Sequence, residues 1–325
     1  MTRIGMLSAA HLHSGAYGPA LNELPNVEFV GLYDNDPERG KERAEAWKTR
    51  YFADREALLN EGLDGVVITS ENIRHKENCL AAAAHRVNVL CEKPIATTAA
   101  DAEEMIKACR DAGVILMTAF PCRFSPATVR LKEAVDSGSL GKILAIKGTN
   151  RGRNPGGWFN DLSLSGGGAV IDHTVHVADL MRWITGAEPK TVFAEIDNSF
   201  HHTDFDDTGT MFIRFDNGMF ATIDCSWSRP KCYPTWGDVT MEVIGEKGSM
   251  YVDLFAQHFR VYSDATGGGA YAPWGDDIDL EMVRAFVNAI ETGAPAPITG
   301  EDGLAAVKVA FAAYESAKTK AATAC

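Results

Sequence analysis

The sequence predicts an α/β protein of two domains, in which a doubly wound parallel sheet is followed by an α+β domain with a large, mostly antiparallel, open sheet. At 325 residues the chain exceeds what one hydrophobic core usually supports. Up to about residue 120, short β-branched runs alternate with helical patterns, which is typical of right-handed βαβ crossovers. From about residue 140 the strands are longer and hairpin signals join them. We therefore expect domains at residues 1–122 and 123–325.

The first domain is expected to alternate strands with helices. The strands are predicted at Ile4 to Ser8, Val27 to Asp34, Gly65 to Thr69, Val87 to Glu92 and Val114 to Ala119. The helices are predicted at Ala16 to Glu23, Pro37 to Trp47, Arg55 to Asn60, His75 to His85 and Ala99 to Ala112. This order places helices on both faces of a parallel sheet, an architecture that binds nucleotides at the carboxyl ends of its strands.

The second domain is expected to be a run of strands closed by two helices. Asn217-Gly218 supplies the positive φ values of a type I′ turn, so Thr210 to Phe215 and Met219 to Trp227 are predicted to form a hairpin. Further strands are predicted at Lys142 to Gly148, Thr191 to Asp197, Thr240 to Ile244, Ser249 to Leu254 and His258 to Tyr262. Gly267-Gly268-Gly269 predicts a loop, and the closing helices are Leu280 to Thr292 and Glu301 to Lys320.

Composition narrows the class of partner and compartment. The chain has 31 Lys plus Arg and 44 Asp plus Glu, a net charge of −13, and so acidic a surface repels nucleic acid and anionic membranes. Its apolar runs are far shorter than the ~20 residues that cross a bilayer. It enters an apolar strand at Ile4 without a signal-peptide pattern. Seven cysteines without a C-x-x-C pair favour thiols in a reducing cytoplasm.

The loop after the first strand is the expected place for a dinucleotide pyrophosphate. The usual G-x-G-x-x-G is absent, and the chain reads Ser-Ala-Ala-His-Leu-His-Ser-Gly from Ser8. Small side chains still let the backbone approach a phosphate, and Ser8 or His13 can add donors. The cofactor contacts predicted around this loop are Ser8, Ala10, His11, Leu12, His13, Thr69 and Ser70.

Asp34 ends the second predicted strand. A carboxylate there accepts both ribose hydroxyl protons of NAD and repels a 2′-phosphate, so NAD is preferred to NADP. The alternative is that the acid belongs to a helix N-cap, for which Asp36 before Pro37 is well suited.

Two motifs together carry a resemblance to a known family. Glu92-Lys93-Pro94 ends the fourth strand, and Asp172-x-x-x-His176 lies within a run from Gly166 to Asp179. In this order they resemble the Gfo/Idh/MocA oxidoreductases, which include glucose–fructose oxidoreductase and inositol dehydrogenase. The resemblance implies a Rossmann domain that binds NAD and hydride transfer between nicotinamide and a secondary hydroxyl of a sugar, cyclitol or related polyol. It also implies that Lys93, Asp172 and His176 are catalytic, that Glu92 and Lys93 lie at the cofactor, and that the lysine–proline peptide is cis.

The chemistry requires these residue types independently of the family. Imidazole titrates nearest neutral pH, so His176 is the natural base for the hydroxyl proton. The ammonium of Lys93 stabilises the developing alkoxide. Asp172, four residues before His176 on a helix, shares its face and can bind a substrate hydroxyl or orient the base. The alternatives are an exposed lysine, a helix N-terminal acid and a core histidine.

The other histidines are harder to assign. On a helix, His173 points about 100° away from Asp172 and either lines the substrate site or packs against the first domain. His11, His13, His173 and His176 invite a metal site, but nothing in their spacing requires one, so no metal is predicted.

Four more side chains are predicted around the substrate. Arg123, after the fifth strand, reaches the cofactor or substrate, or instead forms an interdomain ion pair. Arg151, Arg153 and Trp158 precede the glycine run, where basic and aromatic groups suit a sugar-like polyol; the alternative is solvated arginines.

The sequence therefore predicts an NAD-dependent dehydrogenase that acts on a small polyol or sugar. The alternatives are an NAD-dependent glycosidase that uses transient oxidation and elimination, and a non-catalytic NAD-binding regulator, which has no need of a proton-transfer set. The helices can cover only one face of the antiparallel sheet, and apolar residues on the other face predict a homodimer or homotetramer.

Overall fold

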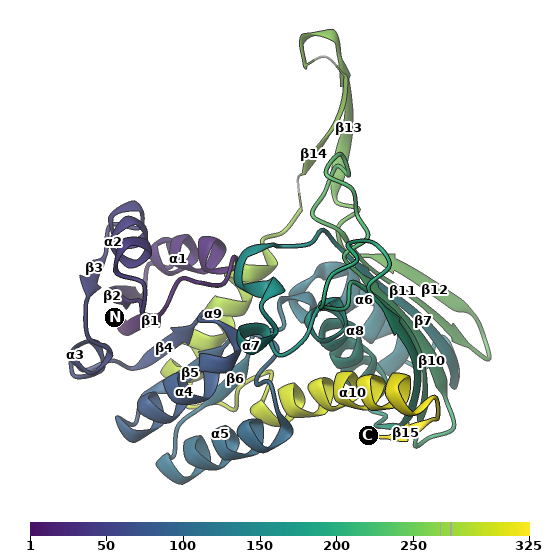
Figure 1. Cartoon of the computed structure of the whole chain (residues 1–325), viewed down its shortest axis with the longest axis horizontal. Coiled ribbons are helices and arrows are strands. Elements are labelled where there is room, and N and C mark those ends of the chain that lie inside the picture. The colour runs from purple at the N-terminus through teal and green to yellow at the C-terminus, as the bar shows by residue number, and fades with distance from the viewer. Residues whose placement is uncertain (267, 274) are drawn as a thin grey trace. The chain divides into compact units, whose positions relative to one another are not determined.

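The computed structural model describes residues 1–266, 268–273 and 275–325, and its chain forms two compact units (Figure 1). The first unit comprises Met1–Pro121, Asp161–Gly166 and Ile278–Ala305. The second comprises Cys122–Asn160, Gly167–Asp277 and Ala306–Cys325. Each unit therefore draws on segments that are distant in the sequence, and the long helix α10 (Gly300–Thr319) begins in the first unit and ends in the second.

The first unit is built on a six-stranded sheet in the order β3-β2-β1-β4-β5-β6, with every neighbouring pair parallel. The strands are β1 (Thr2–Leu7), β2 (Val27–Tyr33), β3 (Arg50–Phe52), β4 (Gly65–Ile68), β5 (Asn88–Cys91) and β6 (Leu116–Thr118). The strand order reverses between β1 and β4, the point at which such sheets bind ligands. This arrangement confirms the predicted doubly wound α/β fold.

Helices cover this sheet, as expected for parallel strands, which need both faces buried. They are α1 (Ser14–Glu23), α2 (Pro37–Ala46), α3 (Arg55–Leu59), α4 (His75–Ala84), α5 (Ala99–Ala112), the short α7 (Leu162–Ser165) and α9 (Ile278–Thr292), with a 3₁₀ turn η1 (Asn72–Arg74). Helix α1 packs on α9, and α4 lies beside α5 (Figure 1). All four residues of β4 are buried.

Side-chain caps explain where two of these helices begin. The Asp36 carboxylate accepts hydrogen bonds from the backbone N–H groups of Glu38 and Arg39, and Pro37 occupies the first helical position of α2. Thr98 accepts from Asp101 N at 3.1 Å and so starts α5 directly after the Glu92-Lys93-Pro94 segment. These local signals place both helix starts within the predicted boundaries.

The second unit contains a seven-stranded sheet in the order β12-β11-β7-β10-β9-β8-β15. Its strands are β7 (Ile143–Arg151), β8 (Pro189–Asp197), β9 (Thr208–Phe215), β10 (Phe220–Ser226), β11 (Asp238–Gly245), β12 (Ser249–Asp253) and β15 (Thr323–Ala324). Strands β7 and β10 are parallel, and the other neighbours are antiparallel. The predicted mostly antiparallel sheet of an α+β domain is confirmed, as is the hairpin that joins β9 to β10. Its predicted type I′ turn is wrong, because Gly218 has a positive φ of 87° and Asn217 does not have a positive φ.

One face of this sheet packs against α8 (Ala169–Thr185), with α6 (Pro126–Asp136) and the end of α10 beside it. Met211, Ile213 and Phe215 of β9 alternate into this core. Gly148 of β7 lies so close to α8 that a Cβ there would approach the Val177 Cγ1 atom to 2.4 Å. Because side chains alternate along a strand, the residues on either side of Gly148 point to the opposite, outer face.

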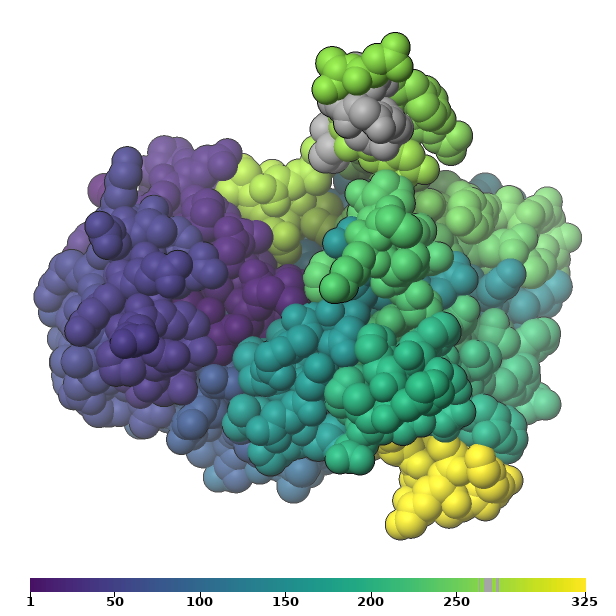
Figure 2. All heavy atoms as spheres, turned by 45° about the horizontal axis from the view of Figure 1, so that its top comes forward, coloured from purple at the N-terminus to yellow at the C-terminus, as the bar shows by residue number. Residues whose placement is uncertain are grey.

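A separate hairpin connects β12 to α9. Its strands, β13 (His258–Ser263) and β14 (Gly268–Pro273), pair only with each other among the described residues, and a 3₁₀ turn η4 (Asp264–Thr266) follows β13. Figure 2 shows this light-green segment at the surface of the second unit. Gly268 and Gly269 therefore belong to a strand rather than to the predicted loop, and Gly267 falls outside the described residues.

Across the described ranges, no helix combines the length and the apolar character needed to span a membrane.

Candidate functional site

The loop between β1 and α1 replaces the glycine fingerprint with a strained serine. Ser8 has φ of 70°, the left-handed conformation that a glycine usually adopts in such a turn. Its N–H donates to Tyr33 O at 2.6 Å, and the Thr69 hydroxyl donates to Ser8 O at 2.6 Å. Thr69 O in turn accepts from His11 N at 2.9 Å. The tight turn that a pyrophosphate loop needs is therefore present without its glycines, so this loop fits a bound dinucleotide.

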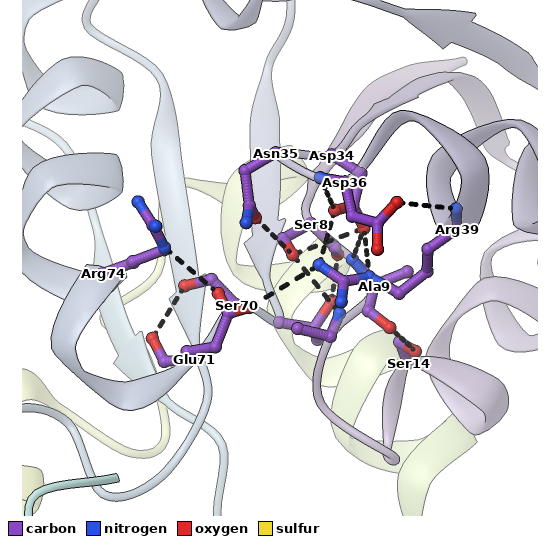
Figure 3. A network of polar contacts seen from close by, with 12 residues as sticks. Ser8, Ala9, Ser14, Asp34, Asn35, Asp36, Arg39, Ser70, Glu71 and Arg74 are labelled. Atoms are coloured by element: carbon purple, nitrogen blue, oxygen red, sulfur yellow. Dashed lines mark hydrogen bonds and ion pairs between the residues drawn. The ribbon is translucent and has the colours of Figure 1, made fainter. Parts of the chain in front are cut away.

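Asp34 connects this loop to the start of α2 through hydrogen bonds, as Figure 3 shows. Arg39 donates to both carboxylate oxygens, from Nε to Oδ2 at 2.9 Å and from a terminal nitrogen to Oδ1 at 2.6 Å. The backbone N–H of Ala9 donates to Oδ2 at 2.6 Å, and that of Asp36 donates to Oδ1 at 2.8 Å. Asp36, not Asp34, is the helix cap, so the N-cap alternative does not account for Asp34. Its role toward the ribose stays a prediction.

Glu92 joins two histidines of the loop in a cluster in which Glu92 and His11 are buried and His13 is partly exposed. His13 Nδ1 lies 3.1 Å from Glu92 Oε1, and His11 Nε2 lies 3.9 Å from Oε2. Burial would raise the pKa of Glu92, but His11, His13 and the neighbouring Lys93 outweigh it and hold that pKa well below its usual range. Burial would likewise lower the pKa of His13, but the Glu92 carboxylate raises it. The cluster therefore carries an ionised carboxylate among proton donors.

The ligand atoms of His11, His13 and Glu92 lie within 4.8 Å of one another, close enough to be tested as a metal site. The N–H of His13 donates to His11 Nδ1 at 3.2 Å, so a neutral His11 carries its proton on Nε2. That proton faces the carboxylate, where a metal ion would bind. The hydrogen bonding therefore favours a proton-sharing cluster. Sequence reasoning missed the grouping, although both segments follow carboxyl ends of parallel strands.

Lys93 is buried directly after β5, and its peptide bond to Pro94 is cis, as the resemblance implied. Its backbone N–H donates to Glu92 Oε2 at 3.0 Å. His75, at the start of α4, lies with Nδ1 3.0 Å from Pro94 O and with Nε2 3.3 Å from Ser70 O. Burial lowers the pKa of His75. The segment that carries Lys93 is thus fixed from both sides, by Glu92 and by His75.

Asp172 and His176 lie one turn apart on α8, and both are buried. Trp227 Nε1 donates to Asp172 Oδ2 at 3.2 Å, and His173 Nε2 lies 3.3 Å from the same oxygen. His176 Nδ1 lies 3.9 Å from the Cys122 sulfur. Trp227 was not predicted, because no sequence pattern connects the end of β10 with α8. Its indole fixes the acid that the motif supplies.

His173 packs inside the second unit. Its Nδ1 lies 3.0 Å from Asn150 O of β7, and its ring meets the Trp227 ring edge-on at 6.5 Å. Its contact with the Asp172 carboxylate makes it a support for that acid. Its predicted place at the substrate or against the first domain stays a prediction.

The start of α8 depends on Gly168 and Asp206. The Asp206 carboxylate accepts from Gly168 N at 2.9 Å, from Val170 N at 2.7 Å and from Tyr314 Oη at 2.8 Å. A Cβ at Gly168 would lie 1.9 Å from Asp206 O, so no other residue fits there. An acid from outside the helix thereby satisfies N–H groups that a glycine cap cannot.

The structure places two of the predicted ligand-binding arginines in ion pairs within the second unit. Arg123 is buried, and its guanidinium binds both carboxylate oxygens of Asp179 on α8, at 2.7 and 2.5 Å. This ion pair lies within the second unit and does not join the two units. The contact of Arg123 with a cofactor or substrate stays a prediction. Arg151 lies on the outer face of the sheet, where it approaches Asp238 at 3.3 Å and Asp224 at 3.6 Å. It therefore points away from the face that carries Asp172.

Arg153 and Trp158 both make contacts within the second unit. Arg153 donates to the carbonyl groups of Tyr233 at 2.7 Å and Thr235 at 2.9 Å, which holds that loop. Trp158 stacks on Phe159 at 3.9 Å and packs against the cluster that contains Trp227. Their predicted contacts with a substrate stay predictions.

The fold and these residues together define an NAD-binding α/β oxidoreductase. Residues 3–120 match the model of an oxidoreductase family with an NAD-binding Rossmann fold, and residues 128–251 match the C-terminal domain model of Gfo/Idh/MocA proteins. The chain belongs to the Gfo/Idh/MocA family.

Its relatives carry several activities. The myo-inositol 2-dehydrogenase of Thermotoga maritima is 31% identical over 330 residues, covering 98% of this chain and 97% of that protein. The 2,7-anhydro-N-acetylneuraminate hydratase of Mediterraneibacter gnavus is 28% identical over 261 residues, covering 75% of this chain and 68% of that protein. The crystal structure of GenD2 from gentamicin A biosynthesis, in complex with NAD, shares the fold with a TM-score of 0.92 at 24% identity, covering 100% of this chain and 96% of that one.

Proposed function

We propose that this chain is an NAD-dependent dehydrogenase of a secondary hydroxyl on a sugar, cyclitol or related polyol. The observation that carries the proposal is the pair of Asp172 and His176 on α8, both buried, with Asp172 held by Trp227 and His173. A structural helix has no need to bury an acid and a base one turn apart. The similarity to myo-inositol 2-dehydrogenase supports the same class of substrate.

NAD, when bound, supplies the hydride acceptor, and the Ser8 to His13 loop, Asp34, Thr69 and Ser70 are the residues that would hold it. His176 accepts the hydroxyl proton, because imidazole is the side chain best matched to neutral pH. The ammonium of Lys93 stabilises the negative charge on the oxygen. Asp172 binds a second hydroxyl or orients the base.

A substrate screen tests the proposal. The purified protein is mixed with NAD and a panel of inositols, aldoses, other polyols and uronates, and NADH absorbance is followed. We expect turnover with at least one cyclic polyol or sugar. NAD binding without NADH formation across the panel, together with unchanged NAD at all pH values tried, would contradict the assignment as a dehydrogenase.

Two substitutions test the proposed catalytic roles of Lys93 and His176. Lys93→Ala and His176→Ala should each lower kcat by about 10² to 10⁴-fold, because each removes a group positioned on the reacting hydroxyl. NAD affinity, measured by calorimetry, should stay nearly unchanged. Lys107→Ala, which removes an exposed lysine of α5, is the matched control and should retain full activity. A variant with near wild-type kcat on the best substrate would remove that residue from the mechanism.

A second candidate is elimination chemistry in which the oxidation is transient. The similarity to 2,7-anhydro-N-acetylneuraminate hydratase is the observation that favours it. Such an enzyme would convert its substrate or release an aglycone while the total NAD stays oxidised. Product analysis beside the absorbance trace separates the two, since a dehydrogenase forms one NADH for each product.

A further inference from the structure

Two buried cysteines face each other in the first unit. Cys79 lies on α4 and Cys109 on α5, and their sulfur atoms are 3.5 Å apart. These helices lie side by side, and both cysteines are buried. In a disulfide the sulfurs are about 2.05 Å apart, so closing this pair brings the two sulfur atoms about 1.5 Å closer together.

The two thiols are not equivalent. The two sulfur atoms are within hydrogen-bond distance, and either can be the donor. This contact, together with burial, raises the pKa of Cys79 well above its usual value. The same hydrogen bond lowers the pKa of Cys109. Since the thiolate is the nucleophilic form, Cys109 is the more reactive member and Cys79 is its immediate neighbour.

Cys109 is fully buried, and it lies beside a cavity. It helps to line a cavity of about 190 Å³ in the first unit, together with Ile106, Arg110, Leu116, Thr299 and Glu301. One water occupies about 30 Å³ of liquid, so the cavity admits a molecule the size of hydrogen peroxide.

We propose that Cys109 and Cys79 form a peroxide-sensitive pair that closes to a reversible disulfide between α5 and α4. The Cys109 thiolate attacks one oxygen of hydrogen peroxide, so that an S–O bond forms, the O–O bond breaks and hydroxide leaves. The Cys79 sulfur then attacks the Cys109 sulfur; an S–S bond forms, the S–O bond breaks, and the leaving hydroxide takes the Cys79 proton as water. Both thiols are oxidised and the peroxide is reduced.

The pair lies close to the segment that carries Lys93. Helix α5 begins at Ala99, just after that segment, and α4 begins with His75, which contacts Pro94 O. Cys91, on the intervening strand β5, is the residue before Glu92. A disulfide would join the two helices that flank this strand. The inference concerns this bond alone and does not depend on the proposed reaction.

The test uses the full chain with its two exposed thiols removed by Cys232→Ser and Cys325→Ser. Hydrogen peroxide is added, and the intact mass and the crosslinked peptides are measured. We expect the loss of two hydrogen masses, a crosslink between the Cys79 and Cys109 peptides, and full reversal by dithiothreitol. In this background, no mass loss at peroxide concentrations that oxidise a free cysteine peptide, or a crosslink to Cys91, would overturn the proposal.

One further substitution identifies the attacking sulfur. With Cys79→Ala, Cys109 has no partner, and unfolding the peroxide-treated chain in the presence of dimedone should trap it as a sulfenic acid. Cys225→Ala is the control, because burial raises the pKa of this lone thiol to about 12, and its removal should leave the crosslink intact. Dimedone labelling at Cys79 in a Cys109→Ala chain, with none at Cys109, would reverse the assigned roles and overturn this step.

Discussion

Groups of the chain itself already donate to the acceptor positions of the Asp34 carboxylate that a ribose would use. A carboxylate has about four acceptor sites, and Arg39, Ala9 and Asp36 donate four hydrogen bonds to Asp34. Arg39 is also 3.6 Å from Glu71, a second carboxylate to which its guanidinium can turn. A ribose diol must therefore displace Arg39 from at least one oxygen, and cofactor selectivity depends on both residues.

We predict that NAD binds more tightly than NADP, and that the two residues have opposite effects on this preference. Asp34→Ala should narrow the preference, because it removes the charge that repels a 2′-phosphate. Arg39→Ala should increase the preference for NAD, because an arginine at this position can bind the 2′-phosphate of NADP. A hydrogen bond to a charged group is worth about 1.5 to 3 kcal/mol, so each change should be about tenfold or more.

Calorimetric titration of NAD and NADP into the three proteins measures this. Asp34→Asn is the matched control for the loop, because it keeps one oxygen acceptor for Ala9. Equal or tighter NADP binding by the unmodified chain would reject the ribose role of Asp34.

The ion pair of His13 and Glu92 predicts a pH dependence of stability. The pKa of His13 is raised in the folded state, so its contribution is complete below about pH 6.5, the unfolded value, and is lost as pH rises through the folded pKa. The pKa of Glu92 is lowered, so its contribution is present above the unfolded value and is lost in acid. The pair therefore stabilises most between the two unfolded values.

Urea unfolding at a series of pH values checks this. His13→Asn should remove the decline above about pH 6.5 and lower the free energy of unfolding by about 1.5 kcal/mol at pH 6, since the side chain is partly exposed. His85→Asn, which removes the exposed pair with Glu56, is the control and should change little. An unchanged profile in His13→Asn would show that the pair adds no net stability.

At the scale of elements, local signals predicted the long helices and the strands of the parallel sheet. In β2 and α5 the apolar residues repeat regularly, and the predicted ends of both elements lie within a residue or two of the observed ends. Strand β3 has only three residues, too few for a period, and was not predicted. Helix α6 was not predicted either, although Pro126 at its first position was a possible signal.

The candidate site was predictable only where one motif carries it. Asp172 and His176 are one helical turn apart, so their shared face follows from the sequence. Partners from other elements, such as Trp227 for Asp172 and Asp179 for Arg123, depend on tertiary packing. The side of the sheet on which Arg151 lies was predicted wrongly. Side chains alternate along β7, and which of them point outward can be told only from the buried residues that pack against this strand.

The Asp206 cap gives a prediction for α8 as a whole. Asp206→Ala removes the acceptor for two N–H groups at the start of the helix, which should lower the free energy of unfolding by about 1 to 2 kcal/mol. Because Asp172 lies in the first turn, we expect kcat to fall more than KM changes. Urea unfolding and steady-state kinetics measure both.

Tyr314→Phe removes one of the three donors to Asp206 and should show a smaller effect of the same kind. Asp161→Ala removes the cap of the short helix α7 and is the control for losing a cap elsewhere. If Asp206→Ala lowered stability and left kcat unchanged, the cap would serve the helix and not the position of Asp172.

For the whole molecule, the outer face of the seven-stranded sheet is the feature to explain. Phe212 and Phe220 stack on this face with ring centroids 5.6 Å apart, and Phe193 is the register partner of Phe212 on β8. Leu144, Ile244 and Tyr251 are exposed on neighbouring strands. The face also holds a cavity of about 460 Å³ with mixed polar and apolar walls, lined among others by Lys147, Thr222 and Glu242. The three phenylalanines of this face therefore cluster on β8, β9 and β10, and further exposed apolar side chains lie on β7, β11 and β12.

We predict that two copies pair through this face as a homodimer, or as the dimers of a homotetramer. A patch of exposed aromatic side chains is unusual on a monomer, and a two-fold axis lets one patch bind its own copy. Light scattering coupled to size exclusion should give at least twice the chain mass of 35.1 kDa at micromolar concentration.

Phe212→Asp should weaken association by at least about 2 kcal/mol, since aromatic residues dominate such interfaces. Leu162→Asp, on α7 of the first unit, adds the same charge at another exposed apolar side chain and should leave the mass unchanged. A single species at the mass of one chain would reject the pairing, and the aromatic patch would then need another partner.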